Sequence, residues 1–132
     1  MIDGQGGLLG KQMVAAVREL LPQAEITAVG TNTMATAAML KAGATNGATG
    51  ENAVVVGARK ADIIVGPVGI VIADSLLGEI TPTMATAIGQ SDAIKILLPV
   101  NKCNNIIVGI GDKTTSELIG EAIEKIKEIS RS

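Results

Sequence analysis

The chain has 132 residues, a formal net charge of −2 and neither histidine nor any aromatic side chain. Aliphatic residues must therefore form the core of what we expect to be a single domain over residues 1–132. Nucleic-acid binding is not expected, because basic residues are few and no aromatic ring is present for base stacking. No apolar run approaches the roughly 20 residues of a membrane span. No basic segment precedes an apolar one as in a signal peptide, so we expect a cytoplasmic protein.

The first part of the chain alternates strand and helix patterns. Residues 1–3 are too few for a full strand, which is either truncated or begins from a start assigned a few residues late. Apolar residues at helical spacing predict a helix from the following glycine-rich turn to Pro22. Residues 25–29 predict a strand, and the capping residues at 31–33 predict a helix that ends near Lys41.

The middle of the chain is less regular. We interpret residues 43–52 as a loop. Residues 52–60 fit a strand, because of their valine run, or a helix that is capped by Thr49, and we favour the helix. Residues 70–77 are apolar and fit either a helix or a strand.

The remaining elements have clearer limits. Thr81 and Pro82 begin a helix, and the last helix begins at Thr114 with Glu117 as its capping-box partner. Further strands are predicted at residues 62–66, 94–100 and 106–110.

This alternation predicts a three-layer α/β/α, Rossmann-like fold with a mostly parallel sheet of about five strands. The gap between the last two predicted strands is only about six residues, whereas a parallel crossover needs a dozen or more. We therefore predict that the last strand pair is antiparallel.

The strongest functional signal is the segment DGQGGLLGK at residues 3–11. Glycines let a backbone approach a phosphate closely, and the N-terminus of the following helix supplies unpaired N–H groups. The segment is not a P-loop, because Gln5 and Gln12 replace its first glycine and its hydroxyl residue. It matches the dinucleotide fingerprint only loosely, because Leu9 stands where the third glycine is expected and Gly10 follows one residue later.

The candidate ligand-binding residues lie in this turn and in the loops after two later strands. They are Asp3, Gly4, Gln5, Gly6, Gly7, Gly10, Lys11, Gly30, Thr31, Asn32, Gly66 and Pro67. The acidic residue that binds ribose after the second strand of dinucleotide folds is missing from this set at residues 30–32. The Asp3 carboxylate is suited to a metal, a ribose or the N–H groups of its own turn, and we slightly favour the last role.

Three functions fit these observations. The first is the binding of a nucleotide or another phosphorylated or anionic small molecule at the glycine-rich turn. The second is a metal-dependent enzyme that uses Asp3, Glu51 or Asp74, which the absence of His and Tyr disfavours. The third is a homo-oligomeric regulatory or scaffold subunit without a ligand. The sequence identifies no cofactor and no catalytic residue, and Cys103 is not expected to be a nucleophile without a His partner. We expect a homodimer, because residues 70–80 are unusually apolar.

Several motifs also resemble a family of small bacterial proteins known only as a domain of unknown function. They are IDGQGG at residues 2–7, GTN at 30–32, GATGEN at 47–52 and GPVG at 66–69. The resemblance spans nearly the whole chain, but it implies no activity. Members of the family usually carry several more apolar residues before the IDG motif, which agrees with a shortened first strand here.

Overall fold

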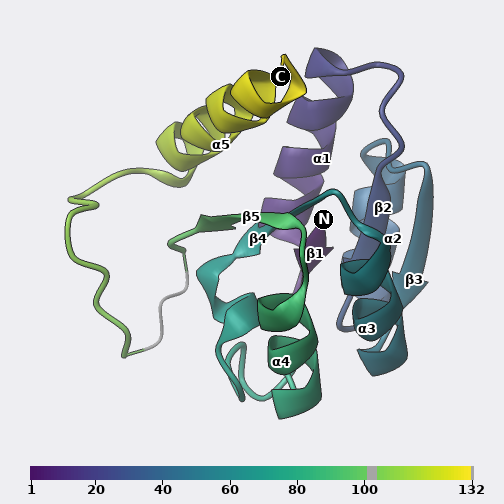
Figure 1. The fold of residues 1–132 in the computed structure, drawn as a ribbon, viewed down its shortest axis with the longest axis vertical. Helices are drawn as coiled ribbons and strands as arrows, with labels where there is room; N and C mark the ends of the chain where they lie inside the picture. The colour runs from purple at the N-terminus through teal and green to yellow at the C-terminus, as the bar shows by residue number, and fades with distance from the viewer. Residues whose placement is uncertain (101–103, 132) are drawn as a thin grey trace.

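The computed structural model describes residues 1–100 and 104–131, which form an α/β fold (Figure 1). The elements in chain order are β1 (Ile2–Asp3), α1 (Leu8–Leu20), β2 (Thr27–Gly30), α2 (Thr33–Lys41), β3 (Asn46–Thr49), α3 (Glu51–Lys60), β4 (Ile63–Pro67), the 3₁₀ helix η1 (Val68–Val71), α4 (Pro82–Gln90), β5 (Ile94–Leu98) and α5 (Thr115–Ser130).

Capping side chains set the starts of three helices, as predicted. Asn32, Thr81 and Thr114 each accept a hydrogen bond from the backbone N–H three residues later, and Glu117 completes the capping box of α5. Residues 51–60 form the favoured helix, although Gly50 rather than Thr49 precedes it.

The strands form two parallel ladders, β1-β2-β3 and β4-β5. β4 lies beside β1, because a Cβ atom on Gly66 would come within 2.6 Å of the carbonyl oxygen of Ile2. The spatial order is therefore β3-β2-β1-β4-β5, with β1 in the middle (Figure 1). Dinucleotide-binding folds share this order of their first five strands, and they bind ligands beyond the carboxyl ends of those strands.

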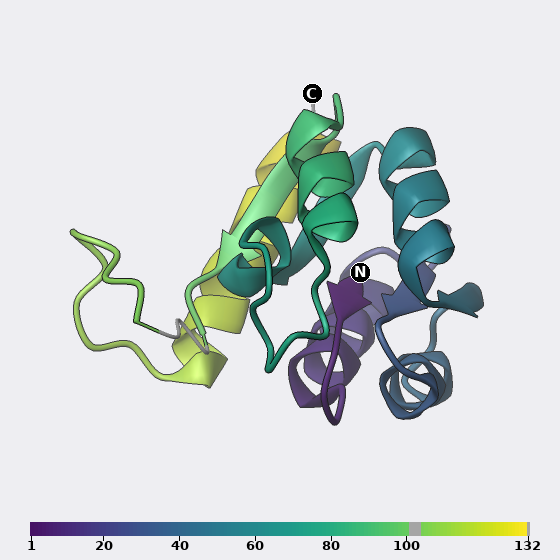
Figure 2. The ribbon, with the colours of Figure 1, turned by 90° about the horizontal axis from the view of Figure 1, so that it is seen from below.

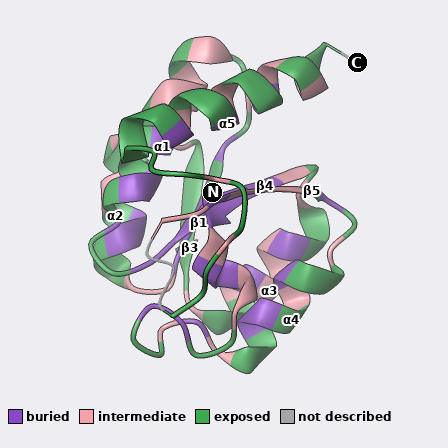
Figure 3. Cartoon of the chain, turned by 90° about the vertical axis from the view of Figure 1, so that its left-hand side faces the viewer, coloured by how far each residue is buried: buried purple, intermediate pink, exposed green. Residues whose placement is uncertain are grey.

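Helices cover both faces of the strands (Figure 2). On one face, α1 packs with α2 over β2 and with α5 over β4 and β5. On the other face, α3 and α4 pack on Ile2, Val29 and Ile64. The core is entirely aliphatic, and Met13 and Met39 are among its largest fully buried side chains. β1 and β4 are buried between these layers (Figure 3).

Three expectations about strands are wrong. β3 forms within the segment interpreted as a loop, where its four small or polar residues are all exposed. Residues 106–110 form no strand, and the side chains of Ile106 and Val108 are each 92% exposed. The last strand pair is β4-β5, and it is parallel rather than antiparallel, because the segment between them contains α4 and is long enough for a crossover. The expectation about Cys103 lies outside the described residues.

The close approach of β4 to β1 gives a first testable prediction. The added methyl group in Gly66→Ala would meet the Ile2 carbonyl and the Ile70 side chain at 2.6 and 2.7 Å, so we expect it to lower the unfolding free energy by about 1–3 kcal/mol. Gly89→Ala in α4 is the control, because no atom lies within 4 Å of its added Cβ and its stability should be unchanged or higher by up to about 1 kcal/mol. Urea unfolding of both variants tests this. A Gly66→Ala variant as stable as the wild type would contradict the packing of β4 on β1.

Candidate functional site

The glycine-rich turn connects β1 to α1 at the carboxyl end of the central strand. It closes through a 2.9 Å hydrogen bond from Gly7 N–H to the Gly4 carbonyl. Gly7 precedes α1 in the left-handed conformation, with φ of 73°, and its added Cβ would lie 2.8 Å from the Ala35 Cα. Glycine is therefore required at this position by the backbone conformation and by the approach of α1 to α2.

The buried Asp3 side chain holds this turn in place through a hydrogen bond. Its side chain is 6% exposed, and its Oδ2 accepts a 2.7 Å hydrogen bond from Gly10 N–H in the first turn of α1. Burial raises the pKa of the Asp3 carboxyl above its ordinary value, although the N–H groups of Gly10 and Gly4 favour the charged form. The nearby negative charge of Glu79 adds to the rise. In this structure Asp3 therefore binds an N–H group of its own segment.

A second carboxylate, Glu79, is bound by the same turn. Its Oε1 accepts hydrogen bonds from Gln5 N–H at 2.6 Å and from Thr31 Oγ1 at 2.7 Å. Asn32 Nδ2 lies at 3.4 Å from Oε1 and 3.3 Å from Oε2, and it also donates to the Gln5 carbonyl at 2.8 Å. Donors from the turn after β1 and from the end of β2 thus converge on one anionic group.

This environment keeps Glu79 ionised. Burial raises the pKa of the Glu79 carboxyl, but the hydrogen bonds from Gln5, Thr31 and Asn32 outweigh that effect, so the pKa lies below its ordinary value. Among the described residues, no Lys or Arg forms an ion pair with this carboxylate. In the part of the chain that the structure describes, neutral donors alone therefore stabilise its charge.

Sequence reasoning missed Glu79 because nothing local indicates its role. It follows Gly78 in an irregular segment between η1 and α4, at 74 residues from Gln5 and 48 from Thr31. Leu76 and Ile80, on either side of it, are buried to 2% and 0% exposure. Asp74 and Leu77 have left-handed backbone conformations, with φ of 66° and 55°. The packing of its neighbours therefore holds Glu79 close to β2.

Gly6 differs from the other candidate glycines. An added Cβ on Gly6 has no atom within 4 Å, and the residue is exposed without a positive φ. The other glycines in the candidate set are each within 3 Å of another part of the chain once a Cβ is added; they are Gly4, Gly7, Gly10, Gly30 and Gly66. Packing explains those five glycines. Within the candidate set, only Gly6 has a backbone that a ligand can approach without meeting another described part of the chain.

Backbone donors beside Gly6 remain available. Within residues 1–100 and 104–131, no acceptor binds the N–H groups of Gly6, Leu8 or Leu9. Lys11 is exposed one turn into α1, and among the described residues its ammonium forms no ion pair. The turn thus offers N–H groups at a helix N-terminus with a cation close by in sequence.

The remaining candidate residues do not join this cluster. Pro67 is fully buried, and Gly66 contacts β1 and η1, so both belong to the core. Glu51 accepts a 2.7 Å hydrogen bond from Thr81, and Asp74 is exposed. Among the residues that the structure describes, no three His, Cys, Asp or Glu side chains come together as a metal site. None of the described helices is both long and apolar enough to span a membrane.

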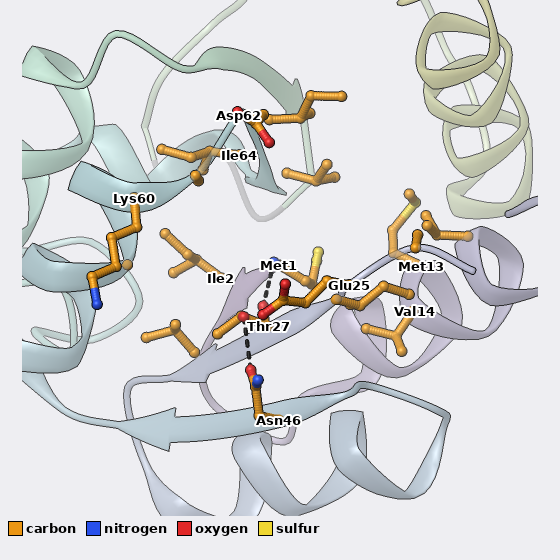
Figure 4. Close-up of a pocket in the computed structure, with 18 of the residues that line it drawn as sticks. Met1, Ile2, Met13, Val14, Glu25, Thr27, Asn46, Lys60, Asp62 and Ile64 are labelled. Carbon is orange, nitrogen blue, oxygen red and sulfur yellow. Dashed lines mark hydrogen bonds between the residues drawn. The ribbon is translucent and has the colours of Figure 1, made fainter. Parts of the chain in front are cut away.

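A cavity of about 680 Å³ lies at the opposite edge of the sheet, away from the glycine-rich turn (Figure 4). It surrounds Met1 and Ile2 between the starts of β2 and β4, and its lining is mostly aliphatic. Glu25, Lys60 and Asp62 contribute the charged groups. None of the candidate ligand-binding residues lines it, and its apolar walls offer little to replace the hydration of a phosphate.

The strand order and the glycine-rich turn define an α/β protein with parallel strands and a polar cluster beyond the central strand. The chain belongs to the family described as Domain of unknown function (DUF3842), which matches residues 1–131. This confirms the resemblance inferred from the motifs. No curated protein and no solved structure matches the chain.

The burial of Asp3 gives a pH-dependent prediction. Folding raises the pKa of Asp3, so protonation of Asp3 stabilises the folded state. This contribution to the free energy of unfolding is complete below the ordinary pKa of 3.8 and is lost as the pH rises through the folded-state pKa. Asp3→Asn cannot ionise, so the stability advantage of the wild type over this variant should be largest at low pH. Near neutral pH the variant should remain about 1–2 kcal/mol less stable, because the amide keeps only one acceptor oxygen.

Urea unfolding of both proteins between about pH 4 and pH 8 measures this difference. Groups common to both proteins, including Glu79, largely cancel in the comparison. A difference independent of pH would contradict the coupling of Asp3 ionisation to folding. Equal stability with a loss of ligand binding would instead assign Asp3 to the ligand.

Proposed function

We propose that this protein binds a nucleotide or another phosphorylated or anionic small molecule at the glycine-rich turn. The observation that carries the proposal is the set of backbone donors at Gly6, Leu8 and Leu9, which have no acceptor within the described residues and lie beside an open glycine. A phosphate at a helix N-terminus accepts such N–H groups and is favoured by the helix dipole. Lys11 supplies a further positive charge in the first turns of the same helix.

The Glu79 cluster supports the same location. It demonstrates that Gln5 N–H and the side chains of Thr31 and Asn32 can hold a negative charge at this edge. The order of the strands supports it as well, because the turn follows the central strand β1 and the order reverses between β1 and β4. The proposal is a binding function, and it assigns no reaction.

Gly6→Val tests the site with little expected effect on the fold. Its side chain would enter open space and cover the backbone that a phosphate approaches, so the unliganded melting temperature should change little while binding is lost. A ligand present at 100 times its dissociation constant adds about 2.7 kcal/mol to the stability of the wild type. A thermal-shift screen with pyrophosphate and ADP measures this gain in both proteins.

Gly89→Val is the matched control, because that glycine is exposed in α4 and its added Cβ also meets no atom within 4 Å. It should keep the stabilisation by ligand. If neither pyrophosphate nor any nucleotide stabilises the wild type, the proposal loses its support. The same conclusion follows if Gly6→Val is stabilised as much as the wild type.

We also propose that the chain forms a homodimer, although the reason differs from that in the sequence. Within the apolar segment, Ile70, Leu76 and Ile80 are buried in the chain's own core, and Leu77 is exposed. Ile106 and Val108, two residues apart in the segment before α5, are each 92% exposed. Exposed apolar side chains that are close together in sequence favour burial against a partner.

Sedimentation velocity at micromolar concentration tests the dimer. We expect the wild type to sediment as a dimer and the double variant Ile106→Ser, Val108→Ser to sediment as a monomer with an unchanged fold. A monomeric wild type contradicts the proposal. A dimeric double variant contradicts the assignment of these side chains to the interface.

A further inference from the structure

We propose that Glu79 binds the hydroxyl groups of the ligand, and that this ligand is a phosphorylated compound with a free vicinal diol, such as a ribonucleotide. The inference rests on the proposed function and specifies the class of its ligand. In dinucleotide-binding folds, an acidic residue at the end of the second strand accepts hydrogen bonds from ribose hydroxyls. Here β2 ends at Gly30 and is followed by Thr31 and Asn32, which have no carboxylate.

The structure supplies the missing carboxylate from a distant part of the chain. Glu79 lies against both residues that follow β2, with its Oε1 at 2.7 Å from Thr31 Oγ1 and its Oε2 at 3.3 Å from Asn32 Nδ2. Gly4 permits this approach, because a Cβ on that residue would lie 2.5 Å from both Glu79 Oε1 and Thr31 Oγ1. The Glu79 carboxylate thus lies at the end of β2, although Glu79 itself belongs to the segment before α4.

The two oxygens of Glu79 are used unequally. Oε1 accepts the short hydrogen bonds from Gln5 and Thr31, whereas Oε2 has, among the described residues, only the 3.3 Å contact with Asn32. An ionised carboxylate offers about four acceptor positions, so Oε2 retains capacity for hydroxyl donors. The side chain is half-buried rather than enclosed, which leaves this oxygen within reach of a ligand.

The phosphate donors lie in the same turn. Gln5 donates its N–H to Glu79, and Gly6 is the next residue, with Leu8 and Leu9 beginning α1 just after it. A phosphate on these amides does not compete with Glu79, because they are different N–H groups. The protein therefore offers N–H donors for a phosphate and a carboxylate acceptor for a diol side by side, so one molecule that carries both groups can bind to both.

A different reading makes Glu79 a stand-in for the phosphate itself, which the ligand would displace. The structure favours the diol for two reasons. The buried side chains of Leu76 and Ile80 hold the segment in place, and the amides of Gly6, Leu8 and Leu9 already provide a separate place for the phosphate.

Isothermal titration with ADP, 2′-deoxy-ADP and pyrophosphate tests the inference on the wild type and on Glu79→Gln. We expect the wild type to bind ADP about tenfold more tightly than 2′-deoxy-ADP, because a hydrogen bond to a charged acceptor is lost in the deoxy compound. Glu79→Gln should weaken ADP binding relative to pyrophosphate binding by a similar factor and abolish this preference. Pyrophosphate binding itself should not weaken, because the variant only removes a negative charge near the anion. Glu19→Gln on the exposed side of α1 is the control and should behave as the wild type.

The outcomes separate the two proposals. Equal binding of ADP and 2′-deoxy-ADP to the wild type overturns the role of Glu79 in diol binding while the anion site stands, and this comparison needs no variant. An equal gain in affinity for ADP and for pyrophosphate in Glu79→Gln also overturns it, by showing that Glu79 occupies the phosphate position and makes no contact with the diol. If neither ADP nor pyrophosphate binds to the wild type or to Glu79→Gln, the proposed function itself fails.

Discussion

One carboxylate joins three segments of this protein that are far apart in sequence. Glu79 accepts hydrogen bonds from the turn after β1 and from the residues after β2, and it belongs to the segment that leads into α4. A half-buried charge without a cationic partner is stable only if enough donors face it, so each of these segments is constrained by the others. The positions of the turn, the end of β2 and the segment before α4 relative to one another depend on this contact.

Much of the fold could be predicted because its signals are local. The caps at Asn32, Thr81 and Thr114 and the apolar spacing of α1 are short-range patterns, and each corresponds to a helix in the structure. β3 was missed because Gly47 and its small or polar neighbours have no strand pattern of their own. That strand forms because β2 provides a partner for its backbone.

Apolar character misled the prediction where it was not accompanied by burial. The run at 106–110 has the composition of a buried strand, yet Ile106 and Val108 lie exposed. Composition likewise predicted the candidate site only in part. Composition located the turn and its glycines, but it could not separate Gly7, which packing requires, from Gly6, which faces open space. The place of Glu79 in the site depends on contacts with residues that are 48 and 74 positions away, and no pattern in the sequence predicts contacts at such separations.

The division of the strands into two ladders has a mechanical consequence. Within the described residues no hydrogen-bonded ladder joins β1 to β4. The two halves are therefore connected by side-chain packing and by side-chain hydrogen bonds, those of Glu79 among them, across a seam in the middle of the molecule. A ligand that contacted both the turn and Glu79 would cross-link the two halves non-covalently. Its binding energy would then appear as greater cooperativity between them, with amide hydrogen exchange slowed on both sides of the seam at once.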